Sequence, residues 1–75
     1  MLEAVFLEEL QELLQRDVPI APDMLLQDME EWDSLAVMSC MAYFDKNFNV
    51  KTRISQYQQL YTVSDLIALA GGAIL

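Results

Sequence analysis

The residues best suited to chemistry in this sequence are Asp33-Ser34-Leu35, which stand between an acidic stretch and a long apolar-patterned one. Asp33 or Ser34 can cap a helix that begins here, and the sequence alone does not choose between them. The Ser34 hydroxyl can also be exposed and carry a covalent group. A phosphate attached to it would lie against the free N–H groups at the positive end of the helix. The triplet by itself leaves the capping and the modification interpretations open.

Other polar residues give weaker signals. Asp28, Glu30 and Asp33 resemble part of a calcium loop but lack the central glycine and the distal glutamate of an EF-hand, so no metal site is expected. Cys40 lies near an apolar helical stripe, where a lone cysteine is usually a small buried hydrophobe. The sequence has no histidine, the commonest general base near neutral pH. No catalytic residue is therefore predicted, and we expect a protein that is not an enzyme.

Length and charge narrow the class of protein. The 75 residues, 55% of them hydrophobic, suffice for one domain over residues 1–75. Twelve acidic and four basic residues give a net charge of −8, which repels nucleic acids and anionic lipid and favours basic protein partners. The charge-free runs Leu35–Phe44 and Leu66–Leu75 are too short to span a bilayer, so no membrane insertion is expected. A single cysteine fits a reducing, cytoplasmic location.

The first half of the chain predicts one helix and a long loop. Residues 2–15 have helical periodicity, and the apolar stripe comprises Leu2, Val5, Phe6, Leu10, Leu13 and Leu14. Residues 17–33 contain Pro19 and Pro22, and five acids lie between Asp23 and Asp33. We expect a short helical turn after Asp23. The apolar side chains expected to pack down onto the bundle are Ile20, Met24, Leu25, Leu26 and Met29.

The second half predicts three further helices. Residues 34–48 form a long helix whose core stripe is Val37, Met41, Phe44 and Phe48, with Asn47 and Asn49 at its exit. An extended connector over 49–54 precedes a short helix over 55–60. Thr62-Val63-Ser64-Asp65 is typical of a capping box, and the last helix runs to about Ala70, before Gly71 and Gly72. The predicted fold is all-α, a small four-helix bundle with three main helices, one short helix and a long first loop.

The second helix has apolar residues away from its predicted core stripe. Leu35, Met38 and Ala42 lie there, together with Ser39 and Lys46. Exposed apolar residues beside a candidate modification site indicate a docking surface for a partner protein. The alternative is that one of them packs under the long loop.

In these features the sequence resembles the acyl carrier protein family over nearly its whole length. The resemblance depends on an acidic helical first half, Asp33-Ser34-Leu35 opening the second helix, and Phe48 near the end of that helix. Tyr61-Thr62-Val63-Ser64-Asp65-Leu66 is similar to the family's Thr-Val-Gly-Asp pattern, with Ser64 in the place of the glycine.

The resemblance implies a function. A phosphopantetheinyl transferase, using magnesium and coenzyme A, would attach 4′-phosphopantetheine to the Ser34 oxygen, and the arm's thiol would hold acyl groups as thioesters. Asp33 and Leu35 would frame the attachment site, and Met38 and Ala42 match positions that contact partner enzymes. The expected partners are acyl-loading and acyl-accepting enzymes with basic docking surfaces, and the carrier is expected to be a monomer. The alternative function is an unmodified acidic helical module for protein–protein interaction.

The sequence departs from the family's fatty-acid-synthesis members at four positions. Trp32 stands where these carriers usually have a small residue, and Ser39 where they commonly have a glutamate. Lys46 and Asn47 reduce the negative charge that is usual at the end of the second helix. These differences favour a specialised carrier from a dedicated biosynthetic pathway over a housekeeping one.

Overall fold

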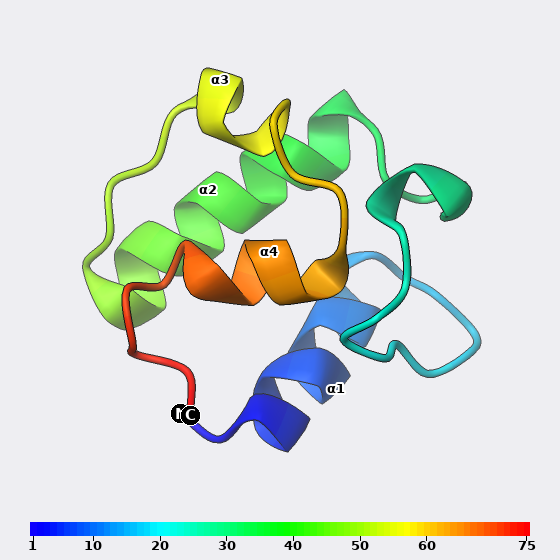
Figure 1. Cartoon of the computed structure of the whole chain (residues 1–75), viewed down its shortest axis with the longest axis horizontal. Helices are drawn as coiled ribbons and strands as arrows, with labels where there is room; N and C mark the ends of the chain where they lie inside the picture. Colours follow the sequence, from blue (N-terminus) through cyan, green and yellow to red (C-terminus); the bar gives the residue numbers. More distant parts are fainter.

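The computed structural model describes residues 1–75 as a helical bundle without strands (Figure 1). Its elements are α1 (Glu3–Leu13), the 3-10 turn η1 (Leu26–Asp28), α2 (Ser34–Phe48), α3 (Ile54–Tyr57) and α4 (Val63–Ala68). Figure 1 shows α2 running the length of the molecule, with α1, α3 and α4 arranged around it. The predicted all-α class, the long first loop and the short third helix are confirmed.

The inner face of α1 is narrower than the sequence predicts. Phe6, Leu10 and Leu14 are buried at four-residue intervals, and Leu13 is half-buried. Leu2 and Val5 are exposed, so their assignment to the core is wrong. Leu2 precedes the first helical residue, and Val5 lies about 100° around the helix from Phe6.

The long first loop is attached to the segment before α4. The N–H of Leu26 donates to the carbonyl of Tyr61 at 2.8 Å, and the N–H of Val63 donates to the carbonyl of Met24 at 3.0 Å. Of the five apolar residues predicted to pack down, Ile20, Leu26 and Met29 are buried and Met24 is partly buried. The prediction is wrong for Leu25, which is exposed because alternate residues of this extended bridge point to opposite sides.

The structure confirms the predicted bounds of α2 but corrects its core stripe. The fully buried residues of α2 are Ala36, Cys40 and Phe44, so the inner face is rotated by one residue from the prediction. The remaining members of the predicted stripe are only partly buried at the edge of the core: Val37, Met41 and Phe48. The physical reason is that α2 is apolar around most of its circumference, so the packing of neighbouring elements decides which row is covered. Asn49, with φ of 56°, ends the helix as expected.

The last two helices are shorter than predicted. α3 begins at Ile54 and ends at Tyr57, whereas the sequence suggests residues 55–60. α4 has the predicted capping box, because Thr62 Oγ1 accepts the N–H of Asp65 at 3.1 Å and Asp65 Oδ2 accepts the N–H of Thr62 at 3.0 Å. After Ala68 the chain tightens into i→i−3 hydrogen bonds and reaches Gly71 and Gly72 at positive φ.

The core is continuous and contains no buried charged or polar side chain. Phe44 lies at its centre, with the rings of Phe6, Phe48 and Tyr57 packed edge-on against it at centroid distances of 5.5–6.5 Å. The chain ends meet on one side of the bundle (Figure 1), where the N–H of Leu75 donates to the carbonyl of Met1 at 2.7 Å. None of the helices has the length and apolar character needed to cross a membrane.

Candidate functional site

Ser34 is the first residue of α2, and its side chain is exposed. Asp33 provides the helix cap, because its Oδ1 accepts the N–H of Ala36 at 2.9 Å. The N-cap residue of α2 is therefore Asp33 and not Ser34, a choice that the sequence alone does not make. The Ser34 hydroxyl makes no hydrogen bond within the protein and remains free to react.

The first turn of α2 also provides unpaired backbone donors. The N–H of Val37 donates to the carbonyl of Asp33 at 3.0 Å, but the N–H groups of Ser34 and Leu35 have no partner within the protein. Such orphan groups carry the positive end of the helix dipole. A phosphodiester on Ser34 therefore fits this position, since its negative charge would lie beside unpaired N–H donors.

A surface groove of about 240 Å³ lies directly beside Ser34, between the start of α2 and α3. Its lining residues are Trp32, Asp33, Ser34, Val37, Met38, Ile54, Tyr57 and Gln58. The Trp32 and Tyr57 rings lie 6.5 Å apart between centroids, at an angle of 42°. The sequence does not indicate Ile54, Tyr57 or Gln58 as site residues. These residues are distant from Ser34 in the chain, and only the tertiary fold brings α3 beside it. The one feature of the sequence that could have indicated this role is Tyr57, a large aromatic residue within the polar stretch Ser55–Gln59.

The predicted partner face is exposed. Leu35 is 71% exposed, Met38 is 55% exposed, and Ala42 is also exposed. Their spacing of three and four residues places them in one row along α2. The alternative that one of them packs under the long loop is wrong, although Ser39, expected beside them, is half-buried.

No family model and no curated protein sequence matches the chain. Among solved structures, the chain is similar to the solution NMR structure of a holo acyl carrier protein from Geobacter metallireducens, with a TM-score of 0.70 and 20% identity. The match covers 89% of this chain and 78% of the other. This chain has the acyl carrier protein fold. At this level of identity the likeness establishes the fold, and the residues of the site are argued from their own geometry.

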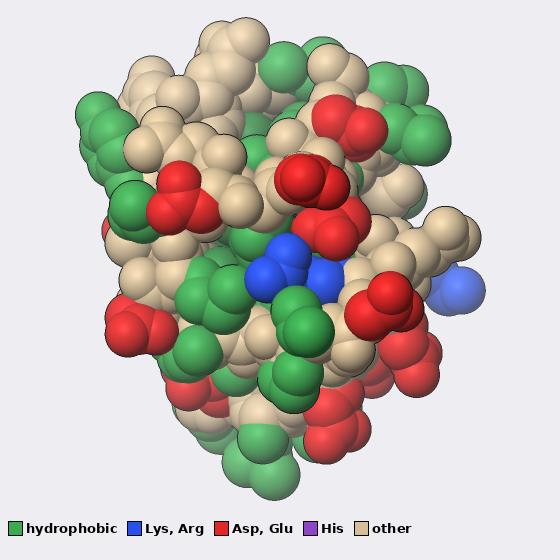
Figure 2. All heavy atoms as spheres, turned by 90° about the vertical axis from the view of Figure 1, so that its right-hand side faces the viewer, with side chains coloured by type: hydrophobic (Ala, Val, Ile, Leu, Met, Phe, Trp, Pro, Cys, Tyr) green, Lys and Arg blue, Asp and Glu red, His purple; other side chains and the backbone are tan.

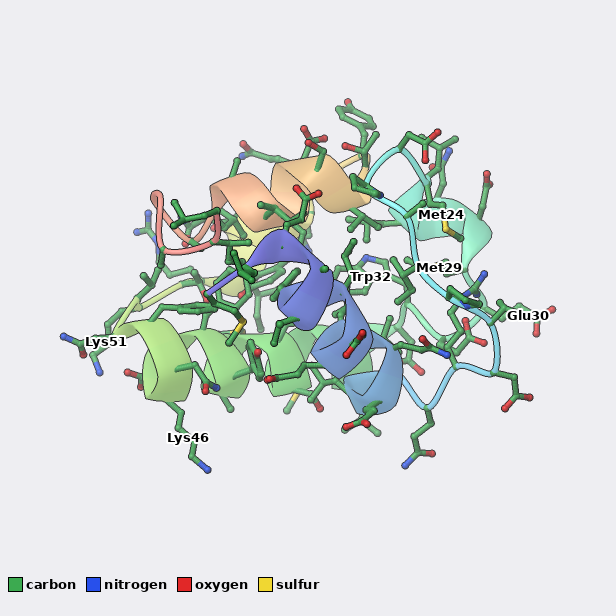
Figure 3. All side chains as sticks on the ribbon, turned by 90° about the horizontal axis from the view of Figure 1, so that it is seen from below. Met24, Met29, Glu30, Trp32, Lys46 and Lys51 are labelled. Atoms are coloured by element: carbon green, nitrogen blue, oxygen red, sulfur yellow. The ribbon has the colours of Figure 1, made fainter.

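Charge is distributed unevenly over this acyl carrier protein fold. Figure 2, seen from the side of the long loop, shows acidic side chains spread over the face with little basic surface among them. Figure 3 shows Lys46 and Lys51 at one end of the molecule, and Glu30 and Trp32 toward the other. Ser34 and Lys46 lie near opposite ends of α2, and four acids directly precede Ser34 in the chain: Asp28, Glu30, Glu31 and Asp33. No three acidic side chains, with or without Cys40, converge in a way that could hold a metal ion.

Cys40 has no place in this site. It is 1% exposed in the core, and burial raises the pKa of its thiol to about 12. The thiol is therefore protonated and enclosed at neutral pH, which confirms the prediction of a small buried hydrophobe.

Proposed function

We propose that this chain is a carrier protein that holds acyl intermediates as thioesters on a 4′-phosphopantetheine arm attached to Ser34. The observation that carries the proposal is the free, exposed Ser34 hydroxyl at the start of α2, where Asp33 alone provides the cap. The acyl carrier protein fold of the solved neighbour supports the same role. The arm's thiol would supply the acyl-transfer chemistry, and no residue of this chain is proposed to be catalytic.

The attachment is a group transfer in which Ser34 is the acceptor. The Ser34 oxygen forms a bond to the phosphorus next to the pantetheine of coenzyme A, and the bond from that phosphorus to adenosine 3′,5′-diphosphate breaks. The hydroxyl proton passes to a base of the partner transferase. The N–H groups of Ser34 and Leu35 are the donors that this chain offers to the resulting phosphodiester.

The partners are a phosphopantetheinyl transferase and acyl-loading and acyl-accepting enzymes of a fatty acid, polyketide or other specialised pathway. The acids of the long loop favour basic docking surfaces on these enzymes. The exposed row of Leu35, Met38 and Ala42 supplies apolar contact area next to Ser34. Charge governs encounter and orientation more than final affinity, so the two features have separate roles. A cytoplasmic location and a monomeric state belong to the same proposal.

The test is co-production with a broad-specificity phosphopantetheinyl transferase, followed by intact-mass measurement. The wild-type chain should gain the mass of one phosphopantetheine, and Ser34→Ala should fold normally and gain none. Ser64→Ala, which removes another exposed hydroxyl at a helix start, is the matched control and should still be modified. Modification of Ser34→Ala would exclude Ser34 as the site. An unmodified wild-type chain would favour the acidic interaction module instead.

A further inference from the structure

A second groove lies between α1 and α2, which pack against each other (Figure 3). It has two parts, of about 350 Å³ and about 500 Å³, and Leu13 of α1 and Ser39 of α2 line both of them. Leu35 lines the first part and Ala42 lines the second. This α1–α2 groove shares only Asp33 with the groove between α2 and α3. It is therefore a separate surface of the molecule.

Two contacts between side chains fix the width of the α1–α2 groove. In its second part, the Tyr43 hydroxyl donates a hydrogen bond to Oε1 of Glu9. Beside its first part, Nη1 of Arg16 donates to Oε1 of Glu31 at 2.9 Å. These contacts join α1 and the residues after it to α2 and the loop before it. The groove is thus formed in the free chain, and a partner need not order it on binding.

The walls of the α1–α2 groove suit a helix. Small residues of α2 recur at three-residue intervals along it, at Ala36, Ser39 and Ala42. Small side chains let another backbone approach closely, and a helix packs its side chains into the groove between two others. An added strand is excluded, because the backbone groups within α1 and α2 are paired inside each helix. From Leu35 to Lys46 the groove follows α2 for about 16 Å, or about three turns.

The charge around one end of the α1–α2 groove selects a cation. The carbonyl groups of Leu13 and Leu14 accept no hydrogen bond within the protein, and the last turn of α1 has no basic residue. These carbonyls carry the negative end of the helix dipole. Arg16, the nearby cation, is already paired with Glu31. Gln15 lines the groove and also a neighbouring polar hollow, whose acids are Glu8, Glu12 and Asp17.

We propose that the α1–α2 groove binds an amphipathic helix of a partner protein. The helix places apolar side chains over Leu13, Ser39 and Ala42, and a lysine or arginine against the carbonyl end of α1. Lys46 lies at the other end of the groove, so the charges also give the bound helix its direction. This inference goes beyond the proposed function, because it requires no arm on Ser34.

The deciding experiment titrates the ¹⁵N-labelled apo chain with a synthetic amphipathic peptide of about 18 residues, long enough to form a helix. The peptide contains leucine, alanine and glutamine, with its leucines on one face and two arginines at its N-terminal end. The amide signals of Leu13, Ser39 and Ala42 should shift, and those of Ile54 and Tyr57 should not. Because the apo chain is used, the result is independent of whether Ser34 accepts an arm.

A peptide of the same composition, with its leucines spread around the helix, controls for attraction to the net charge of −8. It should bind at least about tenfold more weakly. Equal binding of the two peptides would mean that charge alone attracts them, and would overturn the proposal. Absence of binding by the amphipathic peptide, or shifts centred on Ile54 and Tyr57, would overturn it as well.

Substitutions at exposed positions test the walls of the α1–α2 groove. Ala42→Tyr fills its second part and should weaken binding of the amphipathic peptide about tenfold. Met38→Tyr adds the same ring on α2 where it lines the other groove, so binding should keep its wild-type affinity. The melting temperature of each variant establishes that it is folded. Equal affinities of the two folded variants would show that the peptide lies elsewhere.

A second pair of variants tests the charged end. Glu12→Gln with Asp17→Asn removes two exposed acids beside Gln15, and should weaken binding several-fold and reduce its dependence on salt. Asp23→Asn with Asp28→Asn removes the same charge from exposed positions of the long loop that do not line the groove, and should weaken it less. Equal losses in the two double variants would show that no cation is held at the end of α1.

Discussion

The Nη1 atom of Arg16 lies 2.9 Å from Oε1 of Glu31, and this ion pair joins the end of α1 to the loop three residues before Ser34. The side chain of Arg16 is 15% exposed and that of Glu31 is 31% exposed. The Nε of Arg16 is buried without a hydrogen-bond partner. The hydrogen bond that the guanidinium makes is the one from Nη1 to Glu31. The pair therefore holds the loop that leads into the site against the bundle.

The first prediction concerns the pH dependence of this contact. The N–H of its own backbone and the guanidinium of Arg16 lower the pKa of Glu31 below its ordinary value of 4.5. A carboxylate with a lowered folded-state pKa stabilises the fold above its unfolded-state pKa, and this stabilisation is lost as pH falls through the folded-state value. Glu31→Gln should therefore melt below the wild type at pH 7.

The matched control is Glu30→Gln, which removes the same charge from an exposed neighbour without an ion pair. The melting-temperature difference between the two variants should be largest at pH 7 and should shrink toward zero as pH falls below about 4.5. A difference that is independent of pH would mean that the Glu31 carboxylate contributes nothing through its ionisation.

The second prediction concerns the capping box of α4. Thr62→Val removes the oxygen that accepts the N–H of Asp65, and loss of such a cap costs about 1 kcal/mol. In a chain of this size, that corresponds to a fall in melting temperature of about 4–8 °C. Ser64→Ala removes an exposed hydroxyl that makes no hydrogen bond, and should change melting little. Equal effects of the two substitutions would argue against the cap.

The third prediction concerns the exposed row on α2. Met38→Glu should leave the melting temperature nearly unchanged, because Met38 is 55% exposed and lies outside the buried row. It should slow arm transfer by a broad-specificity transferase by about 5–30-fold, equivalent to about 1–2 kcal/mol at a central interface position. Gln59→Glu adds the same charge at an exposed position on the segment after α3, and should be modified at the wild-type rate. Normal transfer to Met38→Glu would show that this face is exposed but unused.

The fourth prediction concerns the net charge of −8. Repulsion among the acids destabilises the folded chain, and salt screens it. The melting temperature at pH 7 should therefore rise with added sodium chloride or magnesium chloride. A double variant, Asp28→Asn with Glu30→Gln, should have a higher melting temperature than the wild type without added salt. Its melting temperature should also rise less when salt is added. A melting temperature that does not change with either salt would show that charge repulsion does not destabilise the folded state.

The sequence predicts most clearly those features that local chemistry determines. The capping box at Thr62 and Asp65 is confirmed because both partners lie within one turn. The exit of α2 at Asn49 is likewise local, since asparagine tolerates the left-handed conformation. The exposure of Leu35 and Met38 also agrees with the prediction.

Features that depend on packing between distant segments are less predictable. The covered side of α2 is the row through Ala36 and Cys40, although the larger Val37 and Met41 give the stronger apolar signal. The groove depends on α3 lying beside the first turn of α2, and no pattern within either segment specifies that contact. The choice of Asp33 over Ser34 as the cap required the geometry, because both residue types can accept the same bond.

The distribution of charge along the chain gives the molecule an electric moment directed along α2. Three of its four basic residues fall within positions 46–53, and five of its twelve acids within 23–33. The 15 residues of α2 span about 22 Å, and the helix begins directly after the acidic segment and ends within the basic one. Near a basic enzyme this moment produces a torque that turns the Ser34 end forward before contact. Lys46 and Lys51 would thus influence how often a collision is productive without touching the enzyme.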